Sequence, residues 1–274
     1  MLLLRFRYLP APRSAWFPSP FSFRFFRLLH ESPMAATQGS GGALEKPALR
    51  GLVFDMDGTL TVPVIDFSAM HRAVLGDEGY VTAKSGNPGG SIDILHHIEA
   101  LAPQEQRRAY EVILDFERQG LDRLQIMPGA TELCGYIDSK QMRRGLITRN
   151  AKASVDLFHQ RFGLKFSPAL SREFRPYKPN PAPLLHICSS WGIPPNEVMM
   201  IGDSLRDDVT CGKRAGAFTC LLDESGRYGP LDALRDDLRP DFVVSSLAEV
   251  QSLLDAHFEL LPHPQKAQPS ICVR

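Results

Sequence analysis

Short apolar segments alternate with helical segments from Gly51 to about Leu254, and this alternation restricts the fold more than any other feature of the chain. Strands that alternate with helices along a chain form a parallel sheet with helices on both of its faces. The sequence therefore predicts an α/β fold built on a parallel sheet. Six segments are predicted as strands because each is an apolar run bounded by turn residues: 51–56, 144–148, 168–171, 198–203, 217–222 and 241–245.

One interval, 66–125, interrupts the alternation, because its apolar residues follow helical periodicity and predict no strong strand. Asp66 or Ser68 is suited to cap a first helix, and Ser91 is suited to open a second. A long, charged, amphipathic helix is expected over 103–124. The chain is therefore expected to carry an all-helical insertion after its first strand.

The first predicted strand runs directly into two carboxylates, in the segment Leu52-Val53-Phe54-Asp55-Met56-Asp57-Gly58-Thr59. Residues at positions i and i+2 of a strand project to one side, so Asp55 and Asp57 share a side. The carboxyl ends of strands are where ligands bind in open α/β sheets, and Gly58 lets the chain turn away sharply. An Asp-Gly pair alone is more often only a turn, but the whole segment is far more specific and indicates a reactive site.

Three later segments add polar residues in a defined order. Gly145-Leu146-Ile147-Thr148 is a second strand that ends in a hydroxyl group, and Lys178-Pro179-Asn180-Pro181 places a lysine just before a helix start. Val198 to Gly202 is a third strand, and it leads into an acidic cluster at residues 203–208. Each segment alone has an ordinary structural explanation, whereas four in this order do not.

Together these four motifs resemble the signature of the haloacid dehalogenase superfamily of hydrolases, in its phosphoglycolate phosphatase-like branch, over roughly Leu49 to Leu254. The resemblance implies a Rossmann-like catalytic core formed by residues 47–63 and 127–260. It also implies that the helical insertion, 64–126, is a cap domain. Such a cap covers a phosphate site, excludes water and supplies the side chains that choose the substrate.

The resemblance further implies a reaction and the residues that perform it. Asp55 would be the nucleophile that forms an aspartyl-phosphate, and Asp57 would protonate the leaving oxygen and then deprotonate the attacking water. Thr148 would hydrogen-bond a phosphoryl oxygen, while Lys178 would balance charge and hold Asp55. The implied substrate-binding residues are Thr59, Arg149 and Asn150.

A cation is expected at this site because several carboxylates would otherwise repel one another. A hard site made of oxygen ligands, with phosphate nearby, selects Mg²⁺ as the cofactor. Both Asp207 and Asp208 are at a suitable distance from Asp203, and Asp208 is favoured because Val209 follows it and its interval to Gly216 suits the family's helix. The implied metal ligands are Asp55, Asp57, Asp203 and Asp208.

Two departures from the family pattern affect these expectations. Leu60-Thr61-Val62-Pro63-Val64 follows Thr59 where many members continue Leu-x-Asp-Ser, so the start of the cap is altered. Arg149 and Asn150 follow Thr148 where a small residue is more familiar. Arg149 could reach a second anionic group on the substrate, or it could be a surface arginine at a helix start.

The leading hypothesis is an Mg²⁺-dependent phosphatase that acts on a small phosphorylated metabolite. A sugar phosphomutase on the same core is an alternative, for which His71 lies in about the region of a helping residue. Dehalogenase chemistry is disfavoured because that branch lacks the second acid, Asp57. A non-catalytic regulator with this fold is a further alternative, and the intact motifs argue against it. Phosphoglycolate, sugar phosphates and nucleotides all remain open as substrates.

Charge balances over the whole chain but is not evenly distributed. Residues 1–46 hold six basic and two acidic residues, which leaves 25 basic against 29 acidic residues in the remainder. A mildly acidic body without a basic run argues against a nucleic-acid partner, and no stretch reaches the length of a membrane span. The expected partner is therefore a small phosphorylated metabolite, without nucleic acid or membrane, and the oligomeric state stays open.

The two ends of the chain differ from its body in composition. Residues 1–46 are rich in arginine and poor in acids, which is typical of an organellar transit peptide and indicates a chloroplast or mitochondrion. The alternative is an extension without an address, and Met34 would then start a cytoplasmic form. Residues 261–274 are expected to be a disordered tail because they contain several prolines.

Overall fold

The computed structural model describes residues 45–86, 92–231 and 234–263. Its main sheet has six parallel strands in the order β4-β3-β2-β5-β6-β7. All six predicted strands are present, each within a few residues of its expected bounds, and the predicted α/β fold is confirmed. The strands are β2 (Gly51–Phe54), β3 (Arg143–Ile147), β4 (Ala169–Leu170), β5 (Val198–Gly202), β6 (Phe218–Leu222) and β7 (Phe242–Val244).

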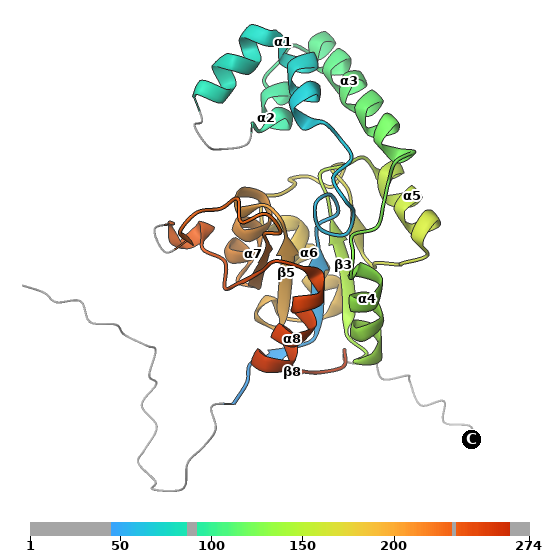
Figure 1. Cartoon of the computed structure of the whole chain (residues 1–274), viewed down its shortest axis with the longest axis vertical. Coiled ribbons are helices and arrows are strands. Elements are labelled where there is room, and N and C mark those ends of the chain that lie inside the picture. The colour runs from blue at the N-terminus through green and yellow to red at the C-terminus, as the bar shows by residue number, and fades with distance from the viewer. Residues whose placement is uncertain (1–44, 87–91, 232–233, 264–274) are drawn as a thin grey trace, which may run out of the picture. The chain divides into compact units, whose positions relative to one another are not determined.

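Helices cover both faces of this sheet, as a parallel sheet requires (Figure 1). Leu52 and Phe54 of β2 pack in one apolar cluster with α4 (Ala130–Ser139), α5 (Lys152–Phe162) and α8 (Leu247–His257). Val53 points to the opposite face, where it packs with α6 (Ala182–Trp191) and α7 (Thr210–Ala215). Alternate residues of β2 thus pack into the two apolar clusters on opposite faces of the sheet. Asp55, which follows the strand, lies at the carboxyl edge of the sheet.

The register of the strands aligns the predicted motifs. Phe54 lies opposite Leu146 of β3 and Ile201 of β5. Asp55 therefore leaves the sheet at the same level as the ends of both neighbouring strands, and its main-chain N–H still donates to the Ile201 carbonyl at 2.9 Å. The three motif strands thus end side by side at the centre of the sheet.

The insertion is all-helical and consists of α1 (Phe67–Ser85), α2 (Ile94–Glu99) and α3 (Pro103–Leu121). These helices share an apolar cluster of their own, centred on buried residues such as Ile98 and Ile113. In Figure 1 the three helices lie together at the top of the view. The chain enters them soon after β2. The insertion therefore has its own small core.

The helix starts of the insertion agree in part with those expected. Asp66 caps α1, with its carboxylate accepting from the Ala69 N–H at 2.9 Å. Asp93, rather than Ser91, caps α2, and Ser91 itself lies outside the described residues. The third helix ends at Leu121, three residues before the expected end.

Both ends of the described chain are hydrogen-bonded to the core. The two-residue strands β1 (Ala48–Leu49) and β8 (Glu259–Leu260) pair in parallel, and both are too short to be predicted from an apolar pattern. The N–H of Leu261 donates to Leu49 at 2.9 Å, and that of His263 donates to Gln141 at 3.1 Å. Residues 261–263 are therefore not part of a disordered tail, which is a correction, while 264–274 and the predicted leader up to residue 44 lie outside the described residues. Among the described helices, none is long and apolar enough to cross a membrane.

Candidate active site

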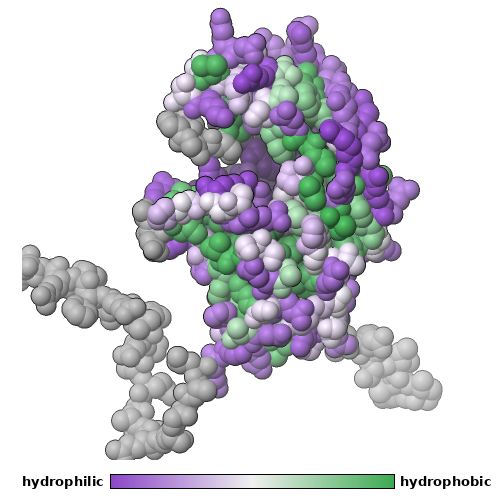
Figure 2. Space-filling view, in the orientation of Figure 1, coloured by the Kyte–Doolittle hydropathy of each residue, from purple (hydrophilic) through white to green (hydrophobic). Residues whose placement is uncertain are grey.

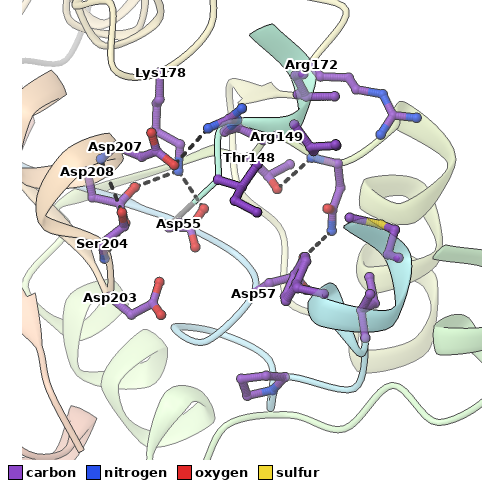
Figure 3. Close-up of a pocket in the computed structure, with 18 of the residues that line it drawn as sticks. Asp55, Asp57, Thr148, Arg149, Arg172, Lys178, Asp203, Ser204, Asp207 and Asp208 are labelled. Atoms are coloured by element: carbon purple, nitrogen blue, oxygen red, sulfur yellow. Dashed lines mark hydrogen bonds and ion pairs between the residues drawn. The ribbon is translucent and has the colours of Figure 1, made fainter. Parts of the chain in front are cut away.

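Three carboxylates meet at the carboxyl edge of the sheet (Figure 3). Asp55 follows β2, Asp203 follows β5, and Asp208 lies in the short helical turn Leu205–Val209 that leads into α7. One oxygen of each lies within 4.8 Å of those of the other two. Three carboxylate oxygens at this separation fit a hard divalent cation such as Mg²⁺. They belong to three of the four ligands that the sequence predicts, and Asp57 is not in this group.

Lys178 bridges two of these carboxylates (Figure 3). Its Nζ donates to Asp55 Oδ1 at 2.5 Å and to Asp208 Oδ1 at 2.6 Å, and the side chain is only 2% exposed. Burial alone would lower the pKa of Lys178, but the Asp208 and Asp55 carboxylates together raise it above its usual range. Lys178 is therefore a permanent cation that fixes both carboxylates, which agrees with the role implied for it.

Burial strongly disfavours the charged forms of the three carboxylates. It raises the pKa of Asp55 and of Asp203 to about 6, and that of Asp208 to about 7. Lys178 opposes the rise at Asp55 and Asp208, and the repulsion between neighbouring carboxylates adds to it. A bound cation would relieve this repulsion, so the cluster is electrostatically suited to hold one.

Asp57 lies apart from the cluster of three carboxylates. Its Oδ2 accepts from the Asn150 amide at 2.5 Å, and its Oδ1 accepts from the Thr61 hydroxyl at 3.2 Å. Burial raises the pKa of Asp57, and these two hydrogen bonds oppose the rise. A carboxyl group with a raised pKa is suited to give and take a proton near neutrality. Its side chain is turned away from the other three, so Asp55, Asp203 and Asp208 alone form the group of potential ligands among the described side chains.

Two glycines let the chain pass close to the carboxylate cluster. Gly58 has φ +79°, and a Cβ placed there would lie 2.6 Å from Asp203 Oδ2. A Cβ on Gly202 would lie 2.2 Å from the Asp208 carboxyl group. Any larger residue at either position would displace a carboxylate of the cluster.

The predicted substrate-binding residues have different surroundings. Asn150 lines the cavity, but its amide is bound to Asp57, and Thr148, also at the cavity, accepts from the Asn150 N–H at 3.1 Å. Thr59 is fully buried, does not line the cavity, and has no hydrogen-bond partner for its hydroxyl among the described residues. Thr59 lies in the turn that follows Asp57. In this turn the hydroxyl of Thr61, and not that of Thr59, donates to the Asp57 carboxylate.

Arg149 connects the cap to the core. It forms ion pairs with Asp93 at the start of α2 and with Asp207, the latter at 3.0 Å, and lies over the Tyr177 ring at 5.4 Å from the centroid. Its guanidinium is therefore not a surface group: it lines the cavity and is paired with two carboxylates in this structure. Because Asp207 faces Arg149, Asp208 is the residue of the two that joins Asp55 and Asp203.

A cavity of about 380 Å³ opens over the carboxylates. Asp55, Asp57 and Lys178 line its core side, and the cap contributes an apolar wall. Figure 2 shows a recess with hydrophilic residues between the cap helices and the core. The apolar residues of the cap side include Ile65, Phe67, Met70, Ile94, Leu95 and Ile113.

Several cavity residues were not predicted. Arg172 and Glu117 form a buried ion pair, and Arg227 donates to the Asp203 carboxylate at 2.6 Å. The hydroxyl of Tyr228 donates to the Asp203 carbonyl at 2.9 Å. None of them belongs to a motif, and no sequence signal identified them. Thr61, which binds Asp57 but does not line the cavity, lies in the altered motif four residues after Asp57, where the sequence could have indicated it.

Comparison with known proteins agrees with this geometry. A sequence profile described as haloacid dehalogenase-like hydrolase matches residues 49–216, which is more than half of the chain. The chain is 66% identical over 217 residues to a haloacid dehalogenase-like hydrolase domain-containing protein of Arabidopsis thaliana, covering 79% of this chain and 88% of the relative. The chain therefore belongs to the haloacid dehalogenase-like hydrolase family.

More distant relatives are phosphatases and hydrolases of the same fold. A phosphoglycolate phosphatase of Chromobacterium violaceum is 29% identical over 222 residues, which cover 75% of this chain and 96% of the relative. The crystal structure of a hydrolase from Pseudomonas syringae superimposes with a TM-score of 0.61 at 22% identity, covering 77% of this chain and 100% of the other. The fold and family are thus those of a phosphatase-like hydrolase.

Proposed function

We propose that the protein is an Mg²⁺-dependent phosphatase that hydrolyses a small phosphorylated metabolite through a phosphate ester of Asp55. The observation that carries this proposal is the arrangement of Asp55, Asp203 and Asp208 around Lys178 at the floor of a cavity that Asp57 also lines. Mg²⁺ held by the three carboxylates would neutralise the charge that develops on the phosphoryl group.

Two displacements at phosphorus account for the reaction. In the first, a carboxylate oxygen of Asp55 bonds to phosphorus while the bond to the leaving oxygen breaks, and Asp57 gives that oxygen its proton. In the second, Asp57 takes a proton from water as the water oxygen bonds to phosphorus. The bond between phosphorus and Asp55 then breaks, which releases phosphate and restores both carboxyl groups.

The remaining residues hold these two in place. Lys178 fixes the orientation of Asp55 through a hydrogen bond, and its charge would help to balance that of the phosphoryl group. Asn150 and Thr61 hold the two oxygens of Asp57, so this carboxyl is presented in one orientation. Thr148 lines the cavity beside them and would donate its hydroxyl to a phosphoryl oxygen. Most of the rate enhancement is then positioning and charge stabilisation, as phosphoryl transfer requires.

Release of inorganic phosphate from a panel of phosphomonoesters, with and without Mg²⁺, tests this proposal. We expect turnover only with Mg²⁺, and loss of turnover in Asp55→Asn with the fold retained. No release from any ester, or a tenth of the wild-type rate in purified Asp55→Asn, would contradict it. A phosphomutase remains a second candidate because His71 lines the cavity, and it would instead yield a rearranged ester without free phosphate.

For localisation, we propose that residues 1–46 direct the protein to a chloroplast or mitochondrion. Their arginine-rich composition supports this, and the plant relative is compatible with it. A fluorescent reporter fused to residues 1–46 should enter one of these organelles. A uniformly cytosolic reporter would favour translation from Met34.

A further inference from the structure

All four cations at the described part of the cavity are already paired. Each of these cations already has a carboxylate partner. A second anionic group on the leaving group of a substrate, such as a carboxylate, would therefore have no unpaired cation to bind in this part of the cavity. His71 adds none, because burial and then the Arg149 charge lower its pKa. The pairs are Lys178 with Asp55 and Asp208, Arg149 with Asp93 and Asp207, Arg172 with Glu117, and Arg227 with Asp203.

Glu117 of α3 offers the opposite kind of group, an acceptor without a donor. Glu117 is only 6% exposed, and one of its carboxylate oxygens, Oε1, accepts a hydrogen bond from Arg172. The other, Oε2, is buried and has no hydrogen-bond partner among the described residues, although the Ala151 N–H is near enough to favour the charged form. Glu117 itself is one of the residues that line the cavity. A buried acceptor left unpaired is unfavourable, so a donor from a ligand would stabilise this site.

The position of Glu117 is on the side of the leaving group. Arg172, its partner, donates its main-chain N–H to the Asn150 carbonyl at 3.0 Å, and Asn150 in turn holds Asp57. Burial, and also the negative charge of Asp57, raise the pKa of Glu117, whereas Arg172 favours its charged form. Glu117 therefore lies near the residue that would protonate the leaving oxygen.

We propose that Glu117 selects the substrate by accepting a hydrogen bond from a hydroxyl group on an uncharged leaving group. This inference rests on the proposed phosphatase function and narrows it. The substrate class is a polyol or sugar monophosphate, whose carbon atoms pack on the apolar wall of the cap and whose hydroxyl pairs with Glu117 Oε2. An ester with a carboxylate at that place would meet a like charge and no free cation, so phosphoglycolate is a poor substrate.

Matched pairs of esters test the proposal with the full-length protein and Mg²⁺. Hydroxyethyl phosphate and phosphoglycolate differ only by a hydroxymethyl group in place of a carboxylate, as do glycerol 3-phosphate and 3-phosphoglycerate. We expect the wild-type kcat/KM to favour the hydroxyl member of each pair by about 10-fold or more, since a hydrogen bond to a charged group has about this effect.

The variant Glu117→Gln places an amide donor where the substrate hydroxyl needs an acceptor. We expect it to lower the ratio of kcat/KM within each pair by about 10- to 100-fold. Glu111→Gln makes the same chemical change at an exposed position of α3 and should keep the wild-type ratio. Melting temperatures establish that each variant is folded.

The possible results separate this proposal from the proposed function. Absence of Mg²⁺-dependent phosphate release from every ester tested, p-nitrophenyl phosphate included, would remove the phosphatase function itself. Activity with any of these esters, together with a wild-type preference for the carboxylate members, would overturn the role of Glu117 alone. An unchanged ratio in folded Glu117→Gln would do the same, and if that variant does not fold, the wild-type ratio decides.

Discussion

The two adjacent acids in the turn after β5, Asp207 and Asp208, should differ in their effect on metal binding when each is replaced. Asp208 is 2% exposed and meets Asp55 and Asp203 in the carboxylate cluster, whereas Asp207 points to Arg149. Asp208→Asn therefore removes one of three charges that face the cation, and Asp207→Asn removes none. We expect only the first to weaken Mg²⁺ binding substantially.

The size of the effect follows from charges at this separation. A pair of unit charges about 4 Å apart at an effective dielectric constant near 20 interacts by about 4 kcal/mol, and a divalent ion doubles this. Much of it is offset because Asp208 no longer repels Asp55 and Asp203, so a net loss of about 1.4–2.8 kcal/mol remains. This corresponds to Mg²⁺ affinity that is about 10- to 100-fold weaker. Asp207→Asn alters a partly exposed ion pair, for which an effect below about threefold is expected.

Calorimetric titration of the metal-free protein with Mg²⁺, without substrate, measures both variants directly. This readout is independent of turnover, so the effect of Asp207→Asn on the Arg149 contact between cap and core does not enter it. Equal weakening in both variants, or greater weakening in Asp207→Asn, would refute the assignment of Asp208 to the metal site.

Two further predictions concern protons and the metal. Saturation with Mg²⁺ at about 100 times its Kd should stabilise the fold by about 2.7 kcal/mol, or about 5–10 °C in Tm. The rise in Tm on addition of Mg²⁺, measured by thermal shift, should become smaller at mildly acidic pH. The raised pKa values of Asp55, Asp203 and Asp208 keep these carboxyl groups protonated at that pH in the folded, metal-free protein, so Mg²⁺ must displace protons to bind. Asn150→Ala removes a hydrogen bond that lowers the pKa of Asp57. The kcat of Asn150→Ala should fall by about tenfold or more, with a small change in KM. The basic limb of the pH profile of this variant should move to higher pH, because the pKa of Asp57 rises. A profile that coincides with that of the wild type would rule out this role for Asn150.

The fold, and the meeting of Asp55 with Asp203, could be predicted because both follow from strand ends. Once Asp55 and Asp203 end neighbouring parallel strands, the register brings them together without any further information. The choice of Asp208 over Asp207 also agrees with the geometry, since neighbouring residues of a helical turn point in different directions.

The contacts between cap and core could not be predicted. Glu117 and Arg172 are 55 residues apart, and Arg149 and Asp93 are 56 residues apart. Each is an ordinary charged residue in its own segment, and only the folded position of the cap makes it a partner. Thr59, which the resemblance implied to bind substrate, is buried and does not line the cavity. The hydrogen bonds of the turn after Asp57 determine where this side chain lies, and the spacing in the sequence does not reveal them.

If Asp55 carries the phosphoryl group during turnover, the phosphorylated protein can be trapped and the modified residue identified. The protein is mixed with Mg²⁺ and an excess of a hydrolysed ester, quenched in acid during turnover, and reduced with borohydride, which converts an aspartyl-phosphate to homoserine. Asp57→Asn should accumulate the intermediate, because the base for its hydrolysis is lost. Mass spectrometry should then find homoserine at position 55, and Asp55→Asn should give none. Steady release of phosphate with residue 55 unmodified, or with the phosphoryl group on another residue, would contradict the account.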